Sequence, residues 1–151
     1  MPAVTIDPSV EACQALVTQI NAGTAYVLAV AATYSEEIID PLEEVDSLRV
    51  DVATDESETL NETLDVENRT SHLIRVWIRS KVDDVENVTI NQLKRLVGKI
   101  FERVNNFDSS NGRARVWECG QDMTQNPDKD LLRESGLFVS SILLRVEVEA
   151  A

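Results

Sequence analysis

The chain has 151 residues, of which 43% are apolar, and its formal net charge at pH 7 is −13. This length and apolar content predict one domain over residues 1–151 with a real buried core, and exclude a disordered acidic tail. So negative a charge argues against binding to bare nucleic-acid backbone, because affinity for phosphate comes from Lys and Arg, and we expect no specific nucleic-acid binding. The sequence has neither a long apolar run nor a secretion signal, so we expect a soluble protein made in a cytoplasm, with no membrane association.

The first expected element is a helix over residues 8–21. Asp7 and Pro8 form an N-cap followed by a first-turn proline, and Gly23 follows the last helical turn. Between them, apolar residues recur at the helical spacing that marks one buried face. These residues are Val10, Cys13, Leu16, Val17 and Ile20.

Three strands are expected next. Tyr26 to Tyr34 is a β-favouring apolar run, residues 48–52 alternate between apolar and charged side chains, and residues 73–79 do the same. Acidic connections at 35–47 and 55–69 join these strands and are longer than a tight hairpin needs. Long connections of this kind usually carry contacts or stay disordered.

Thr89 opens the clearest helix of the sequence, which runs to about residue 105. Its apolar positions form one broad face. On the opposite side Arg95, Lys99 and Arg103 recur every four residues, so we expect them to form a basic stripe along the exposed side of the helix.

Two further strands are expected at about 114–120 and 138–148. The predicted order is therefore α-β-β-β-α-β-β. The fold class that this order favours is α+β, with a mainly antiparallel or mixed sheet of about five strands and two amphipathic helices packed on one face of it.

Residues that could support catalysis or metal binding are few. The sequence holds one histidine, His72, and two cysteines without metal spacing, Cys13 and Cys119, and its five glycines form no phosphate-binding loop. The acids near Asp55 lack the ligand order of a calcium-binding loop. We therefore expect no enzyme activity, no metal and no cofactor; a metal-dependent hydrolase built on the acidic connections is a weaker alternative.

Trp77 lies between Arg75 and Arg79 in the alternating pattern, so the three side chains share one strand face. An open face of this kind stacks on sugar or base rings, which leaves a carbohydrate-binding module as a further alternative. The interpretation that we favour places Trp77 beneath the acidic connections, with the arginines paired to their carboxylates.

Charge is distributed very unevenly along the chain. Residues 1–65 contain 14 acids and the single base Arg49, whereas residues 66–151 contain 13 of each. If acidic connections and basic stripe lie on opposite flanks, copies can dock head to tail; if they lie together, they neutralise one another within one copy. The proposed inter-subunit contact joins Arg95, Lys99 and Arg103 to acids of an adjacent copy, namely Glu36, Glu37, Glu43, Glu44, Asp55, Glu56 and Glu58.

The order of the expected elements, with LRVDV at 48–52, HLIRVWIRSKV at 72–82 and DLLRESGLFVSSILLRV at 130–146, resembles the tail-terminator and neck proteins of tailed bacteriophages. The resemblance covers nearly the whole chain and rests on the order and patterning of its elements.

The resemblance implies a virion protein, assembled in the host cytoplasm as a homo-oligomeric ring, typically a hexamer. Such a ring caps the tail tube protein, joins the head-neck connector protein, lets DNA pass through its lumen and has no enzyme activity. Another neck component, such as a head-completion or connector protein, is the alternative within this class.

Overall fold

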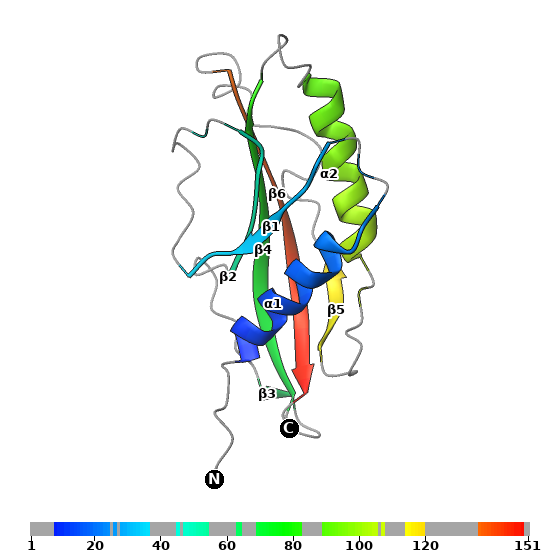
Figure 1. The fold of residues 1–151 in the computed structure, drawn as a ribbon. Coiled ribbons are helices and arrows are strands. Elements are labelled where there is room, and N and C mark those ends of the chain that lie inside the picture. The colour runs from blue at the N-terminus through cyan, green and yellow to red at the C-terminus, as the bar shows by residue number, and fades with distance from the viewer. Residues whose placement is uncertain are drawn as a thin grey trace.

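The computed structural model describes residues 8–24, 26, 28–36, 45, 47–54, 63–64, 69–82, 89–105, 107, 114–119 and 136–149. Within this part the fold is α+β, as the sequence predicts, with two helices beside one mixed sheet (Figure 1). The elements in chain order are α1 (Pro8–Asn21), β1 (Ala32–Tyr34), β2 (Arg49–Thr54), β3 (Thr63–Leu64), β4 (Arg69–Lys81), α2 (Ile90–Val104), β5 (Ala114–Cys119) and β6 (Leu137–Glu149).

The sheet has the strand order β1-β2-β4-β6-β5, and the two-residue β3 pairs with β4 off this path. β1 runs parallel to β2, whereas every other described pair is antiparallel. β4 and β6 pair along their whole length, from Arg69 opposite Glu149 to Lys81 opposite Leu137. This long ladder is the centre of the fold. β3 lies inside the acidic connection 55–69, where no strand was predicted.

Both helices pack on the same face of the sheet. The apolar faces of α1 and α2 contact the strand side chains that point to this side of the sheet. Together these residues form one buried cluster. Burying a Leu or Ile side chain contributes about 1.5–3 kcal/mol, so this cluster is the main source of stability. Its centre includes Leu16, Ile20, Val76, Leu96, Ile100, Ile142 and Leu144.

The start of α2 is fixed by local chemistry. Gln92 N donates to Thr89 Oγ1 at 3.2 Å, and Thr89 N donates to Gln92 Oε1 at 3.0 Å. This reciprocal pair is a capping box, which satisfies two backbone donors that a helix N-terminus otherwise leaves unpaired. The predicted N-cap is therefore confirmed.

The strand predicted over Tyr26 to Tyr34 is wrong for most of the residues that the structure describes there, since among them only Ala32–Tyr34 pairs with β2. Burial still alternates from Leu28 to Tyr34, with Leu28 and Val30 packed on the core. The β-favouring pattern of residues 28–31 thus gives a segment with alternating burial, but this segment pairs with no strand among the described residues. Asn21 fixes where pairing begins: its side-chain amide donates to Ala32 O and accepts from Ala32 N, at 3.0 and 2.7 Å.

The second face of the sheet is also largely buried. Val45, from the acidic connection 35–47, packs there with Leu137 and Val139, and the partly buried Trp77 lies against them. This contact agrees with the interpretation that Trp77 lies beneath an acidic connection. Most of the connections 35–47 and 55–69 lies outside the described residues.

Candidate subunit interface

The basic stripe predicted on α2 is only partly a free surface. Arg95 and Lys99 are exposed, and Lys99 Nζ lies 3.5 Å from Glu102 Oε2 on the next turn. Exposed pairs of this kind contribute about 0–1 kcal/mol because water and salt screen them. In the described part of the chain, no hydrogen bond or ion pair engages Arg95.

Arg103, the third member of the stripe, is bound to the other helix. Its Nε donates to Gln19 O at 3.0 Å, and Gln19 Nε2 donates in return to Arg103 O at 3.2 Å. The last turn of α1 contains no basic residue of its own. Arg103 therefore brings a positive charge to the C-terminal end of α1, where the helix dipole favours a cation. The periodicity of α2 gives no sign of this role, which depends on how the helices meet.

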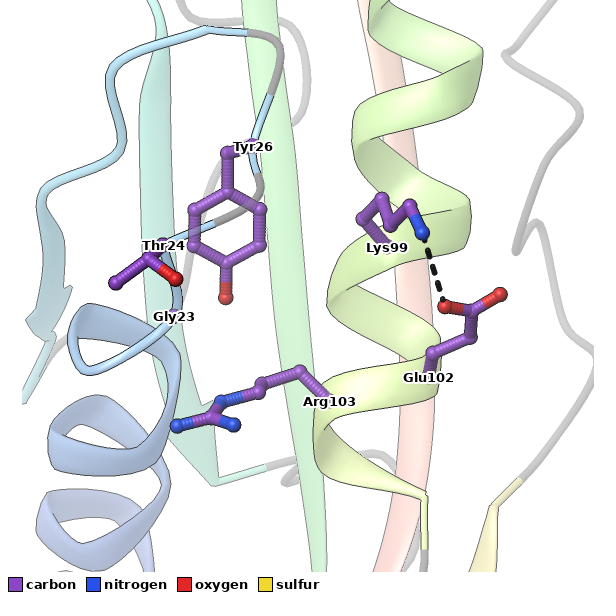
Figure 2. A pocket seen from close by; sticks show the side chains of 6 residues that line it. All are labelled: Gly23, Thr24, Tyr26, Lys99, Glu102 and Arg103. Carbon is purple, nitrogen blue, oxygen red and sulfur yellow. Dashed lines mark hydrogen bonds and ion pairs between the residues drawn. The ribbon is translucent and has the colours of Figure 1, made fainter.

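A hollow of about 260 Å³ lies between α2 and the segment that leaves α1 (Figure 2). Figure 2 shows the Arg103 guanidinium extending from α2 toward α1 below the Tyr26 hydroxyl, whereas Lys99 turns toward Glu102. Among the described residues, those that line the hollow are Gly23, Thr24, Tyr26, Lys99, Glu102 and Arg103, which bring two cations and one carboxylate to it.

Tyr26 forms a fixed wall of this hollow. Its hydroxyl donates to Ile20 O at 2.8 Å. Its ring lies so close to Gly23 that a Cβ added there would be 2.5 Å from the hydroxyl oxygen. Burial raises the pKa of Tyr26 above its ordinary value, and the positive charge of Arg103 opposes part of that rise. The hydroxyl therefore stays protonated at neutral pH and donates this hydrogen bond.

Of the acids proposed for the contact, Glu36 is exposed and follows β1 directly. In the strand order β1 is at one edge of the sheet, whereas α2 packs on β6 toward the other edge. Glu36, the described acid of the proposed contact, therefore lies on the flank opposite Arg95 and Lys99. The remaining acids, Glu37, Glu43, Glu44, Asp55, Glu56 and Glu58, lie outside the described residues.

A buried ion pair on the second sheet face was not predicted. Arg79 Nη2 lies 3.0 Å from Asp51 Oδ2, and these residues are only 1% and 2% exposed. Thr33 Oγ1 donates to the other carboxylate oxygen at 2.9 Å. From the sequence we expected the arginines of β4 to pair with carboxylates of the acidic connections. The carboxylate that pairs with Arg79 instead belongs to the neighbouring strand β2. Predicting this ion pair would have required the strand register, which sets Asp51 opposite Trp77 and therefore diagonal to Arg79.

Arg75 covers part of the Trp77 surface considered for ring stacking. Its Cζ lies 5.5 Å from the centre of the indole ring, and its Nη1 donates to Ser141 Oγ at 2.8 Å. A guanidinium over an indole face is attracted by the ring quadrupole. A sugar ring stacking on that face would have to displace Arg75.

Two of the residues considered for metal or nucleophilic chemistry are buried. Cys13 is buried in the core, where burial raises the pKa of its thiol to about 12, and His72 is buried in β4. The described residues contain no group of three His, Cys, Asp or Glu side chains arranged to hold a metal ion. Cys13 thus acts as a small core residue; the side chain of Cys119 is outside this description.

None of the helices in the described ranges combines the length and apolar character that crossing a bilayer requires. No protein-family model matches the chain, and no curated protein sequence matches it either. What the protein does is therefore inferred from its fold and its surface charges.

Proposed function

We propose that this protein is a structural virion protein of a tailed bacteriophage, a tail terminator that assembles into a ring, caps the tail tube and joins it to the head-neck connector. Two features support the proposal. The element order and the quoted segments resemble that family, and the mixed sheet with both helices on one face has the architecture that the resemblance implies.

The observation that carries the proposal is the separation of charge across the sheet. Arg95 and Lys99 are exposed on α2, over the β6 side, and Glu36 is exposed beyond the β1 edge. Groups on opposite flanks are not positioned to pair within one copy, but they can pair between copies. A repeated contact between two different surfaces forms a closed ring when its rotation closes, and we propose a hexamer.

The overall acidity of the chain suits a ring through which DNA moves. Carboxylates repel phosphates and so limit adhesion of the passing strand, whereas lysines and arginines would retain it. The net charge of −13 has this sign. In this proposal the protein acts through its surfaces, without a catalytic step, in the virion after assembly in the host cytoplasm.

The proposal is tested by reversing one charge on α2. Lys99→Glu is expected to raise the dissociation constant of the assembly, measured by light scattering and native mass spectrometry with and without tail tube protein. Lys94→Glu is the matched control, because Lys94 is also exposed on the same helix but lies outside the basic stripe of Arg95, Lys99 and Arg103. Arg103 is unsuitable for this test, since its substitution would also remove its hydrogen bond to α1.

Two outcomes would overturn the proposal. A wild-type chain that stays monomeric at every concentration, with and without the tube protein, would exclude a ring. Unchanged assembly of Lys99→Glu would exclude this surface as the contact. The mass of the assembled particle and the identity of its partner separate a terminator from another neck component.

A further inference from the structure

We propose that the hollow between α1 and α2 is a carboxylate socket that receives Glu36 of a second copy of this chain. The inference rests on the proposed function and deepens it, because it replaces a general attraction between charged flanks with one pocket and one occupant. The socket is defined by the six lining residues given above.

The walls of the socket are fixed before any partner arrives. Tyr26 is anchored to Ile20 O and packed against Gly23, and Arg103 is anchored to Gln19 O. Both anchors are carbonyls at the end of α1, so one helix terminus positions both side chains. Binding to a formed pocket avoids the entropy cost of ordering its walls.

Arg103 offers the donors that a carboxylate requires. Its Nε is used by Gln19, and in the described structure no hydrogen bond uses its two terminal nitrogens, Nη1 and Nη2. Its side chain is partly buried, which weakens screening by water and strengthens its pairing with an anion. Lys99 adds a second positive charge at the rim, although Glu102 neutralises part of it. The local balance favours a single incoming carboxylate.

Glu36 suits the socket as an occupant. It is exposed, and no described residue forms a hydrogen bond or ion pair with it. The backbone just before it is held in place, because Ser35 N donates to Val52 O at 2.9 Å and so continues the β1–β2 pairing. Because β1 and α2 lie toward opposite edges of the sheet, Glu36 is positioned for the socket of a neighbour rather than for its own.

The first experiment tests the position of the socket by introducing a carboxylate into it from a residue of the same chain. Thr24 is exposed and lines the hollow, so Thr24→Glu places a carboxylate beside Arg103. We expect the dissociation constant of the ring to rise about tenfold or more. Ala22→Glu adds the same charge two residues away on an exposed position that does not line the hollow, and it is expected to change assembly less than about threefold. Circular dichroism and thermal melting confirm that both variants fold.

The occupant is identified by exchanging charges. Glu36→Lys and Lys99→Glu are each expected to weaken assembly about tenfold, and the double variant Glu36→Lys/Lys99→Glu to recover most of the loss, because each new lysine meets a new carboxylate across the contact. The measurement is native mass spectrometry over a concentration series of the full chain.

The outcomes separate the two proposals. If wild type assembles but Thr24→Glu has no effect, or acts no more strongly than Ala22→Glu, the socket is excluded while the ring remains. If Thr24→Glu acts as expected but the double variant shows no recovery, Glu36 is not the occupant. A wild-type monomer overturns the proposed function and the socket together.

Discussion

The face of the central sheet under the helices is buried and the opposite face is largely buried, but the two faces differ in chemistry. The face under the helices presents Val76, Ile142 and Leu144, which are part of one apolar cluster. The opposite face presents the Asp51–Arg79 ion pair and the group of Arg75, Trp77 and Ser141.

The two faces therefore contribute differently, one mainly to stability and the other to the choice of strand register. Apolar contacts stabilise any register that keeps the same residues inward, whereas a buried carboxylate and guanidinium must meet in one alignment. A two-residue shift of β2 along β4 that sets Asp51 opposite Arg75 would preserve the apolar face and separate Asp51 from Arg79. We therefore assign the bulk of the stability to the helix side and the choice of register to the opposite side.

The largest expected effect comes from breaking the ion pair. Asp51→Ala removes the carboxylate beside a guanidinium that is 1% exposed, and we expect a loss of about 3–5 kcal/mol in the free energy of unfolding. Urea denaturation measures it. The double variant Asp51→Leu/Arg79→Met is expected to stay within about 1 kcal/mol of wild type, because it removes both charges. A small loss in Asp51→Ala alone would show that the pair does not constrain this face.

A slightly smaller effect is expected on the helix side. Ile142 is 0% exposed at the middle of β6, so Ile142→Ala should lower the free energy of unfolding by about 2–4 kcal/mol through lost burial and a cavity. Its neighbour Leu143 lies on the other face and is only partly buried. Leu143→Ala is the control, and an equal loss in both variants would contradict the dominance of the helix side.

The smallest effect is a pH dependence from Cys13. The pKa of this thiol rises from 9.0 to about 12 on folding, so the folded chain retains a proton that the unfolded chain releases, and stability falls as the pH rises from about 9 toward 12. At pH 9.5 we expect the loss to be below about 1 kcal/mol. Comparing denaturation of wild type and Cys13→Ala across pH 8–10 isolates this component; equal slopes would mean that the thiol ionises in the folded state.

Features governed by neighbouring residues could be predicted from the sequence. The bounds of α1 and α2, the cap at Thr89 and the alternation of β4 and β6 all follow from local spacing. The fold class follows from their order. For the site, periodicity correctly indicated that Arg95 and Lys99 are exposed.

Features that depend on how distant segments meet could not be predicted. The shortened β1, the pairing of Asp51 with Arg79 and the attachment of Arg103 to α1 each require the register or the helix contact to be known. Gly23 and Tyr26 were missed as wall residues of the hollow for the same reason. Glycine after a helix signals only a terminus, and nothing local shows that an aromatic ring will pack on it.

The β4–β6 ladder also has a consequence for folding kinetics. Even its nearest pairing along the chain, Lys81 with Leu137, encloses α2 and β5. Closing so long a loop costs entropy before the ladder yields any contacts, and chains dominated by distant contacts fold in milliseconds to seconds rather than microseconds. Until β6 is in place, the edge of β4 that pairs with it has unpaired backbone groups, to which other strands can bind. The newly synthesised protein is therefore most vulnerable to aggregation in this interval, before β6 pairs with β4.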